Sequence, residues 1–169
     1  MKISSFSNMV CSIAGAVDIV GDRWAILLVR DLFIGLRRYE DFRSSTNIPP
    51  TTLSNRLKVL EIGGIIRKSL YQSNPDRFEY SLTAKGRGLW QVMLALAKWG
   101  DEHELSGRQF APMRFVNSHT GNDVEIRIID SVLKTDVVPE NILSLEGNGA
   151  DDQVKKRLTI AERRNSKAK

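Results

Sequence analysis

The chain has 169 residues, of which 41% are hydrophobic and 27% are charged, so it is long enough for one globular domain with a buried core and an appendage. Its single cysteine excludes an internal disulfide and a cysteine-only zinc site. The formal net charge of +5 favours a polyanionic partner, and residues 37–87 alone carry ten Lys and Arg against five Asp and Glu.

The N-terminal region has no positively charged leader with an apolar core, and no apolar run of about 18 residues occurs, so we expect a cytoplasmic protein. Residues 14–20 can form a short helix that stops at Gly21. Asp22 is a suitable N-cap for the next helix, residues 23–34, because its carboxylate can accept bonds from free backbone N–H groups. That helix is apolar over most of its circumference, which predicts a central position in a three-helix core, with Trp24 as a core anchor.

A basic pair precedes a second short helix, predicted over residues 39–45 with Phe42 facing inward. Arg37 and Arg38 could contact DNA phosphates, because polar helix ends at a helix-turn-helix commonly do so. The alternative is a solvated basic pair, and composition alone would favour it. Residues 47–49 supply the turn to the next helix.

A polar helix is predicted to follow this turn. Pro50 suits its first position, because the φ angle of proline is already helical and its missing N–H would be unpaired there. Three leucines recur at helical spacing and would be buried: Leu53, Leu57 and Leu60. Gly63 and Gly64 supply the C-terminal stop.

Branched and aromatic residues then predict strands over residues 65–71 and 78–82, joined by a polar turn at residues 73–76. A polar helix followed by a hairpin with a basic tip is a winged helix, a mainly α fold with a small β component. Such a helix fits the major groove of B-DNA, which is about 12 Å wide. The hairpin tip would lie against phosphates or the adjacent minor groove.

The DNA-binding candidates are side chains that can reach bases or phosphates from these elements: Arg37, Arg38, Pro50, Thr51, Thr52, Asn55, Arg56, Lys58, Asn74 and Arg77. Asn55 can bind adenine with two hydrogen bonds, and Lys58 can reach guanine or phosphate. Arg56 could instead brace the fold through a local carboxylate. An ordinary amphipathic helix with a solvated face is the alternative, and helical spacing does not reject it.

Several motifs lie in register with these elements: Gly-Asp-Arg-Trp at 21–24, Arg38-Tyr39, Leu53-Ser54-Asn55-Arg56-Leu57 and Tyr80-Ser81-Leu82-Thr83. On these motifs, residues 11–99 resemble the HxlR-type branch of the MarR-like bacterial transcriptional regulators. The resemblance implies a dimeric winged-helix protein that binds DNA as a repressor or an activator. In that family a proline usually follows the cysteine, whereas Ser12 follows it here.

Thr83 caps a long helix that we predict to continue to about residue 103. The helix carries two neighbouring apolar stripes, although one is enough to cover the domain's own core. An exposed second stripe would mark an interface. We therefore predict a two-fold dimer with its recognition helices about 34 Å apart on a pseudo-palindromic site. The interface candidates are Leu89, Trp90, Met93, Leu94 and Ala97.

The C-terminal part is predicted to hold a small β-rich appendage and a tail. Residues 108–150 alternate short apolar runs with Gly, Asn and Asp turns, which predicts short strands. Some regulators of this branch carry a similar tail that resembles a cysteine-bearing zinc-ribbon module, but no cysteine occurs in this tail, so we expect no metal. Residues 151–169 are basic, and a disordered tail is the default expectation, with a frayed or partly helical one as the alternative.

Cys11 is a tentative redox-sensing residue, because some regulators that the chain resembles sense oxidants or electrophiles at this position. Such chemistry needs an accessible thiolate with a lowered pKa. The alternative is a buried, inert cysteine, which the lack of an adjacent Lys or Arg favours. The chain shows no phosphate-binding glycine loop, no nucleophile elbow and no paired catalytic carboxylates, so we expect neither an enzyme nor a cofactor.

These features predict a homodimeric DNA-binding transcriptional regulator, and a repressor more than an activator. Redox or ligand modulation is left open. The alternative from another class is a sensor or interaction module that uses its winged helix to bind a protein or a small ligand. Concentration of the basic surplus in residues 37–87 favours DNA.

Overall fold

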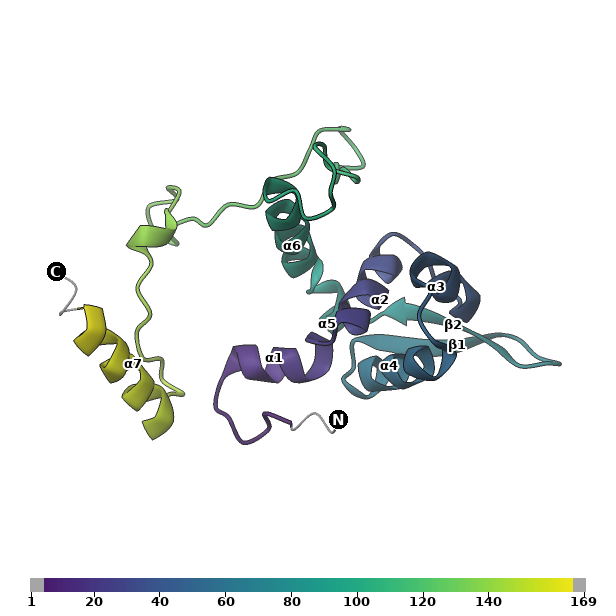
Figure 1. The fold of residues 1–169 in the computed structure, drawn as a ribbon, viewed down its shortest axis with the longest axis horizontal. Coiled ribbons are helices and arrows are strands. Elements are labelled where there is room, and N and C mark those ends of the chain that lie inside the picture. The colour runs from purple at the N-terminus through teal and green to yellow at the C-terminus, as the bar shows by residue number, and fades with distance from the viewer. Residues whose placement is uncertain (1–4, 166–169) are drawn as a thin grey trace. The chain divides into compact units, whose positions relative to one another are not determined.

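The computed structural model describes residues 5–165, which divide into two compact units. One unit is Asp22–Arg127, and the other combines residues 5–21 with residues 128–165. None of the described helices is long and apolar enough to cross a bilayer. The elements in chain order (Figure 1) are α1 Ser12–Val20, α2 Arg23–Phe33, α3 Tyr39–Thr46, α4 Pro50–Ile62, β1 Ile66–Gln72, β2 Arg77–Leu82, α5 Ala84–Arg87, α6 Trp90–Glu102, a 3-10 turn at Pro139–Asn141 and α7 Asp152–Asn165.

Helices α2, α3 and α4 form the predicted three-helix core of the unit Asp22–Arg127. Asp22 is the N-cap of α2, as predicted, and its carboxylate accepts from the N–H groups of Trp24 and Ala25 at 2.9 and 3.3 Å. Trp24 itself is only half-buried, and the Arg23 guanidinium lies over its ring. The fully buried side chains come instead from the inward faces of the three helices: Leu28, Val29, Phe42, Leu53 and Leu60.

A small antiparallel sheet packs beside these helices, and its hairpin extends away from them (Figure 1). Ile66 pairs with Leu82, and the register continues to a bulge between Leu70 and Gln72. A further extended segment, which the sequence did not predict, adds to the outer edge of β2. Arg38 forms a β-bridge with Glu79, and the N–H of Tyr80 donates to the carbonyl of Arg37 at 2.8 Å. The sheet and the helices together form a winged helix.

The predicted long helix over residues 83–103 is broken into α5 and α6. Thr83 caps α5, as predicted, because its hydroxyl accepts from the N–H of Gly86 at 3.1 Å. The break falls after two glycines, which favour a helix interior less than any residue except proline. Gly86 is required for another reason, since an added Cβ would lie 2.1 Å from the carbonyl oxygen of Ile65.

The prediction of a β-rich appendage over residues 108–150 is wrong in its secondary structure. All of these residues are described, and they form only two isolated bridges, Val116 with Asp123 and Ile129 with Asp136, besides the 3-10 turn. The short apolar runs stay exposed, so no long-range sheet partner extends the two bridges into strands. The boundary between units also falls within this segment, after Arg127.

The expectation of a disordered tail is likewise corrected. Residues 152–165 form α7, with Asp152 in its first turn, where a carboxylate interacts favourably with the helix dipole. The carboxylate of Asp151 also accepts from the N–H of Val154 at 2.8 Å. The end of the predicted tail, residues 166–169, lies outside the described residues.

Candidate nucleic-acid interface

Helix α4 presents a polar face to solvent and an apolar face to the core. Leu53, Leu57 and Leu60 are at most 3% exposed. The polar side chains on the other faces are exposed, among them Thr51, Asn55 and Lys58, with Pro50 exposed at the start and Thr52 half-buried beside them. This separation follows from the helical spacing of the leucines. The exposed face carries hydrogen-bonding groups that can reach base edges.

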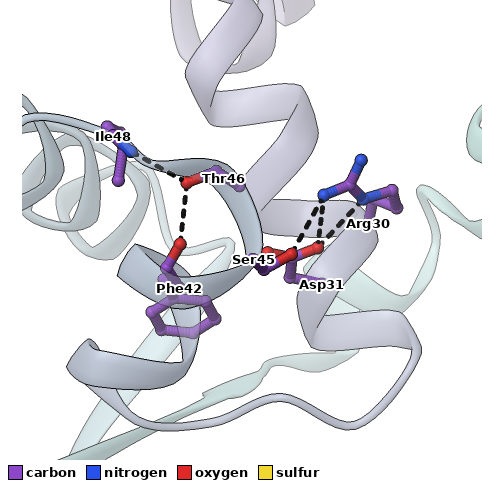
Figure 2. Close-up of polar contacts among 6 residues, drawn as sticks. All are labelled: Arg30, Asp31, Phe42, Ser45, Thr46 and Ile48. Carbon is purple, nitrogen blue, oxygen red and sulfur yellow. Dashed lines mark hydrogen bonds and ion pairs between the residues drawn. The ribbon is translucent and has the colours of Figure 1, made fainter.

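The turn between α3 and α4 is fixed by local hydrogen bonds (Figure 2). The hydroxyl of Thr46 donates to the carbonyl of Phe42 at 2.7 Å and accepts from the N–H of Ile48 at 3.3 Å. Asn47 adopts a positive φ of 54°, which asparagine tolerates better than most residues. Ile48 is 2% exposed and anchors the turn in the core. The start of α4 is therefore held at a defined place relative to α3.

An arginine paired with a buried carboxylate links α2 to α3 beside this turn (Figure 2). Asp31 is fully buried, and its Oδ1 accepts from Nε and Nη2 of Arg30 at 2.9 and 2.7 Å. The same Nη2 donates to the hydroxyl of Ser45 at 3.3 Å. Within the described chain, Oδ2 of Asp31 has no hydrogen-bond partner. A buried charge is tolerated only when it is paired, so Arg30 must stay in this position.

Tyr39 is a positioning residue that the sequence analysis did not single out. Its hydroxyl donates to the carbonyl of Pro50 at 2.9 Å and lies 3.4 Å from the hydroxyl of Ser54. The side chain of one helix thus holds the first turn of the next. The only sequence signal was its place in the Arg38-Tyr39 motif.

The basic pair lies at the junction of α3 and the wing. The Asp41 carboxylate accepts from the N–H groups of Arg37 and Arg38 at 3.3 and 2.9 Å. The Arg38 guanidinium lies 4.4 Å from the ring centroid of Tyr71 on β1. Arg38 is therefore an exposed cation held over the hairpin, near the end of β1 that leads into the wing turn.

The wing tip carries the remaining predicted residues, Asn74 and Arg77, and both are exposed. In the described chain no carboxylate lies within 4.0 Å of the Arg77 guanidinium. Arg56 differs from the other candidates, because its Nε lies 2.9 Å from Oδ1 of Asp22 and its side chain is largely buried. The structure therefore places Arg56 in a brace between α4 and α2, apart from the exposed polar face.

Helix α6 was predicted to supply a dimer interface, and its two apolar stripes differ in exposure. Leu94 is 5% exposed, and Leu89, Met93 and Ala97 are half-buried. Trp90 packs on the ring of Phe33 at a centroid distance of 4.8 Å and on Phe115 at 5.5 Å. The more exposed apolar residues of α6 are Val92, Leu96 and Trp99. The stripe named as the interface is thus mostly occupied within the chain.

Cys11 lies at the N-cap position of α1 and is half-buried. The backbone amides of Ala14 and Ile13 lower the pKa of its thiol, and Arg157 lowers it further. Burial acts in the opposite direction but is outweighed. A cation near the thiol was not visible in the sequence, because Arg157 is far away along the chain. Among residues 5–165, no group of three His, Cys, Asp or Glu side chains is arranged to hold a metal ion.

Comparisons with known proteins agree with this geometry. The HxlR-like helix-turn-helix family matches residues 19–107. An uncharacterized HTH-type transcriptional regulator of Mycobacterium bovis, Mb3122, is 33% identical over 138 residues, which is 82% of this chain and 87% of the relative. The HTH-type transcriptional regulator YvaP of Bacillus subtilis is 36% identical over 97 residues, which is 57% of this chain and 90% of the relative.

Solved structures show the same fold. PA1607, a proposed transcription factor, superposes with a TM-score of 0.72 at 28% identity, covering 85% of this chain and all of that one. The redox regulator HypR in its oxidized form superposes with a TM-score of 0.51 at 31% identity, covering 54% of this chain and 96% of its own. With the family match spanning more than half of its length, the chain belongs to the HxlR-like helix-turn-helix family of transcriptional regulators.

Proposed function

We propose that this regulator acts in the cytoplasm as a homodimer that binds a pseudo-palindromic operator and represses transcription by occluding a promoter. The observation that carries the proposal is the exposed polar face of α4, with Thr51, Asn55 and Lys58 opposite a buried leucine face. An α-helix of this kind fits the major groove, where each base pair presents a distinct pattern of donors and acceptors.

The proposed contacts fall into two classes. Asn55 and Lys58 reach base edges, and Thr51 meets a thymine methyl or a phosphate. Arg38 beside the hairpin and Arg77 at its tip contact the phosphate backbone or a narrow minor groove. The other contacts that we propose around them are Arg37, Pro50, Thr52 and Asn74. Arg56 acts indirectly, since its guanidinium is engaged by Asp22.

We place the dimer contact on α6, on the exposed residues Val92, Leu96 and Trp99 rather than on the inner stripe. Contiguous exposed apolar side chains on one helix commonly mark an interface. A two-fold axis there would present two α4 helices to successive major grooves, about 34 Å apart.

A pair of variants separates the two classes of contact. Asn55→Ala should weaken operator binding by about 1–3 kcal/mol and relax sequence preference at one position, because a base-edge contact is lost. Arg38→Ala should weaken binding to all duplexes, because a phosphate contact is lost. The slope of log K against log salt concentration should then become shallower by about one. Fluorescence anisotropy over a salt series measures both, and Arg108→Ala, an exposed arginine outside the winged helix, is the matched control.

The rival function is a sensor or interaction module whose winged helix binds a protein or a small ligand. Phosphate contacts require log K to fall by about 0.9 per neutralised phosphate for each unit of log salt. A flat salt response, with Asn55→Ala and Arg38→Ala behaving alike, would favour this rival.

Oxidant control is a further part of the proposal and rests on Cys11. Its lowered pKa and partial exposure suit a reactive thiolate. HypR, a redox regulator whose oxidized form has been solved, is similar to this chain. Because each chain has a single cysteine, a disulfide at Cys11 would join two chains.

A further inference from the structure

A cavity of about 620 Å³ lies within the unit Asp22–Arg127, between the end of α2, the end of β2 and the α5–α6 junction. Its size is within the usual range for small-molecule sites, about 300–1,000 Å³. No residue of α4 and none of the wing turn at residues 73–76 lines it. The cavity is therefore separate from the helix face that we propose for DNA bases.

Three arginines line this cavity, and no acidic residue does: Arg37, Arg67 and Arg87. Within the described chain, none of these three guanidinium groups has a carboxylate within 4.0 Å. Like charges that share one cavity repel each other, and here the repulsion is moderated by solvent because all three arginines are exposed. A bound anion would relieve this repulsion.

The arginines are positioned by the surrounding strand and helix. Nε of Arg67 donates to the hydroxyl of Ser81, its cross-strand neighbour, at 2.9 Å. Nη1 of Arg87 donates to the carbonyl of Leu82 at 3.1 Å. Each bond uses one N–H of a group that has five, so donors remain for a ligand. Guanidinium groups bind carboxylates with two parallel hydrogen bonds, which makes a carboxylate the best-matched anion.

Another part of the cavity wall is aromatic. Phe33 and Trp90, whose ring centroids lie 4.8 Å apart, line it together with Leu32 and Leu82. The same two rings also line a second cavity of about 390 Å³, where Met93, Phe115 and other apolar residues surround them. A ligand of matching chemistry has a flat apolar body for this wall and one negative group for the arginines.

We propose that this cavity is a binding site for an aromatic carboxylate, with the carboxylate held by Arg67 and Arg87 beside Arg37 and the ring placed against Phe33 and Trp90. Arg37 is shared with the proposed DNA contacts, but binding of the carboxylate can be measured on the protein alone, without DNA. It would give the regulator a ligand site that is distinct from Cys11.

Isothermal titration calorimetry of the full chain in phosphate-free buffer tests the proposal with a matched pair of probes. 2-Naphthoate should bind, and 2-naphthamide, a neutral compound of the same shape, should bind at least about tenfold more weakly because it lacks the charge-assisted bonds. Equal binding of the two probes, or no binding of 2-naphthoate, would overturn the proposal.

Variants locate the site. Arg67→Gln and Arg87→Gln should each weaken 2-naphthoate about tenfold, as expected for one lost charged hydrogen-bond pair, and leave duplex affinity unchanged. Lys68→Gln is the control, because Lys68 is the next residue on β1, faces the ring of Phe78 and does not line the cavity. Near-ultraviolet circular dichroism checks that each variant is folded.

Two other outcomes would reject the site. If Lys68→Gln weakened 2-naphthoate as much as Arg67→Gln, the probe would be responding to general surface charge. If Arg67→Gln and Arg87→Gln weakened duplex binding and left 2-naphthoate unaffected, these arginines would belong to the DNA-contacting surface instead.

Discussion

Asp22 joins two helices through one carboxylate. It caps α2 by accepting from the N–H groups of Trp24 and Ala25, and it pairs with Arg56 of α4 at 2.9 Å. Both charged side chains are largely removed from solvent, so each depends on the other for compensation. The recognition helix is thus fastened to the start of α2 by a residue that the sequence identified only as a cap.

Substitution of Asp22 separates these two roles. Asp22→Ala removes the cap and the ion pair, and it should lower the free energy of unfolding by at least about 1–2 kcal/mol. Asp22→Asn keeps a good capping group and loses only the charge, so it should lower this free energy less. Urea denaturation followed by circular dichroism measures both, and equal losses would show that the cap contributes little.

Cys11 should react as a thiolate at lower pH than an ordinary cysteine. Because its pKa is lowered, the thiolate fraction rises earlier as pH increases, and the rate of alkylation by iodoacetamide should reach half its maximum at a lower pH than that of a free cysteine measured alongside. Diamide, which takes two hydrogen atoms from two thiols, should then link two chains by a disulfide and change operator affinity.

The controls for Cys11 are Cys11→Ser and Arg157→Gln. The first should abolish both the cross-link and the response to diamide, and the second should raise the pH at which alkylation is half-maximal. An operator affinity that falls equally in wild type and Cys11→Ser would remove the sensor role. Non-reducing electrophoresis and fluorescence anisotropy supply the two measurements.

At the level of elements, the junction between β2 and α5 is fastened to the turn that follows α4. The hydroxyl of Thr83 donates to the carbonyl of Gly64 at 2.6 Å, and Nζ of Lys85 donates to that of Gly63 at 2.8 Å. Gly86 then packs directly against the carbonyl of Ile65. Three successive carbonyl groups are therefore each covered by one residue of the junction.

Gly86→Ala should destabilise this junction. The added methyl would overlap the carbonyl of Ile65, and relief requires backbone movement, so we expect a loss of about 1–3 kcal/mol in the free energy of unfolding. Gly100→Ala is the matched control, because no atom lies within 4 Å of its added Cβ and alanine favours a helix, so stability should rise by about 0.5–1 kcal/mol. Equal effects in a urea titration would contradict the packing argument.

The sequence predicted those elements whose cause is local. The leucine spacing of α4, the cap at Asp22, the cap at Thr83 and both strands of the wing follow rules that act over a few residues. The sequence did not predict the break near Gly86. That glycine is required by its close contact with the carbonyl of Ile65, a residue about 20 positions earlier in the chain. The sequence also missed the bridge between Arg38 and Glu79 and the lack of strands in residues 108–150, since each depends on distant partners.

In the candidate site, too, the sequence predicted the features with local causes and missed the contacts between elements. The exposure of Thr51, Asn55 and Lys58 follows from the helical period and is as expected. The brace between Arg56 and Asp22 and the hold of Tyr39 on α4 are contacts between elements, which spacing along the chain does not reveal. The sequence did not show which stripe of α6 is the more exposed, because Phe33 and Phe115 pack on Trp90 from elsewhere in the chain.

For the whole molecule, the proposed dimer predicts a change in mass. Val92→Glu places a charge on the exposed stripe of α6 and should convert a dimer into a monomer, because burying an unpaired carboxylate is strongly unfavourable. Val132→Glu, at an exposed valine in the other unit, should leave the mass unchanged. Sedimentation velocity at micromolar concentration measures both, and a monomeric wild type would remove the dimer from the proposal.

The junction between β2 and α5, formed by Thr83, Lys85 and Gly86, has a consequence for operator selectivity. It ties the end of α4 to the start of the segment that leads into α6, without a flexible linker between them. In a dimer built on α6, rotation of that helix would also rotate α4, the helix that we propose to contact the bases. Substitutions at this junction should therefore alter the preferred gap between half-sites while leaving the choice of bases within each half-site intact.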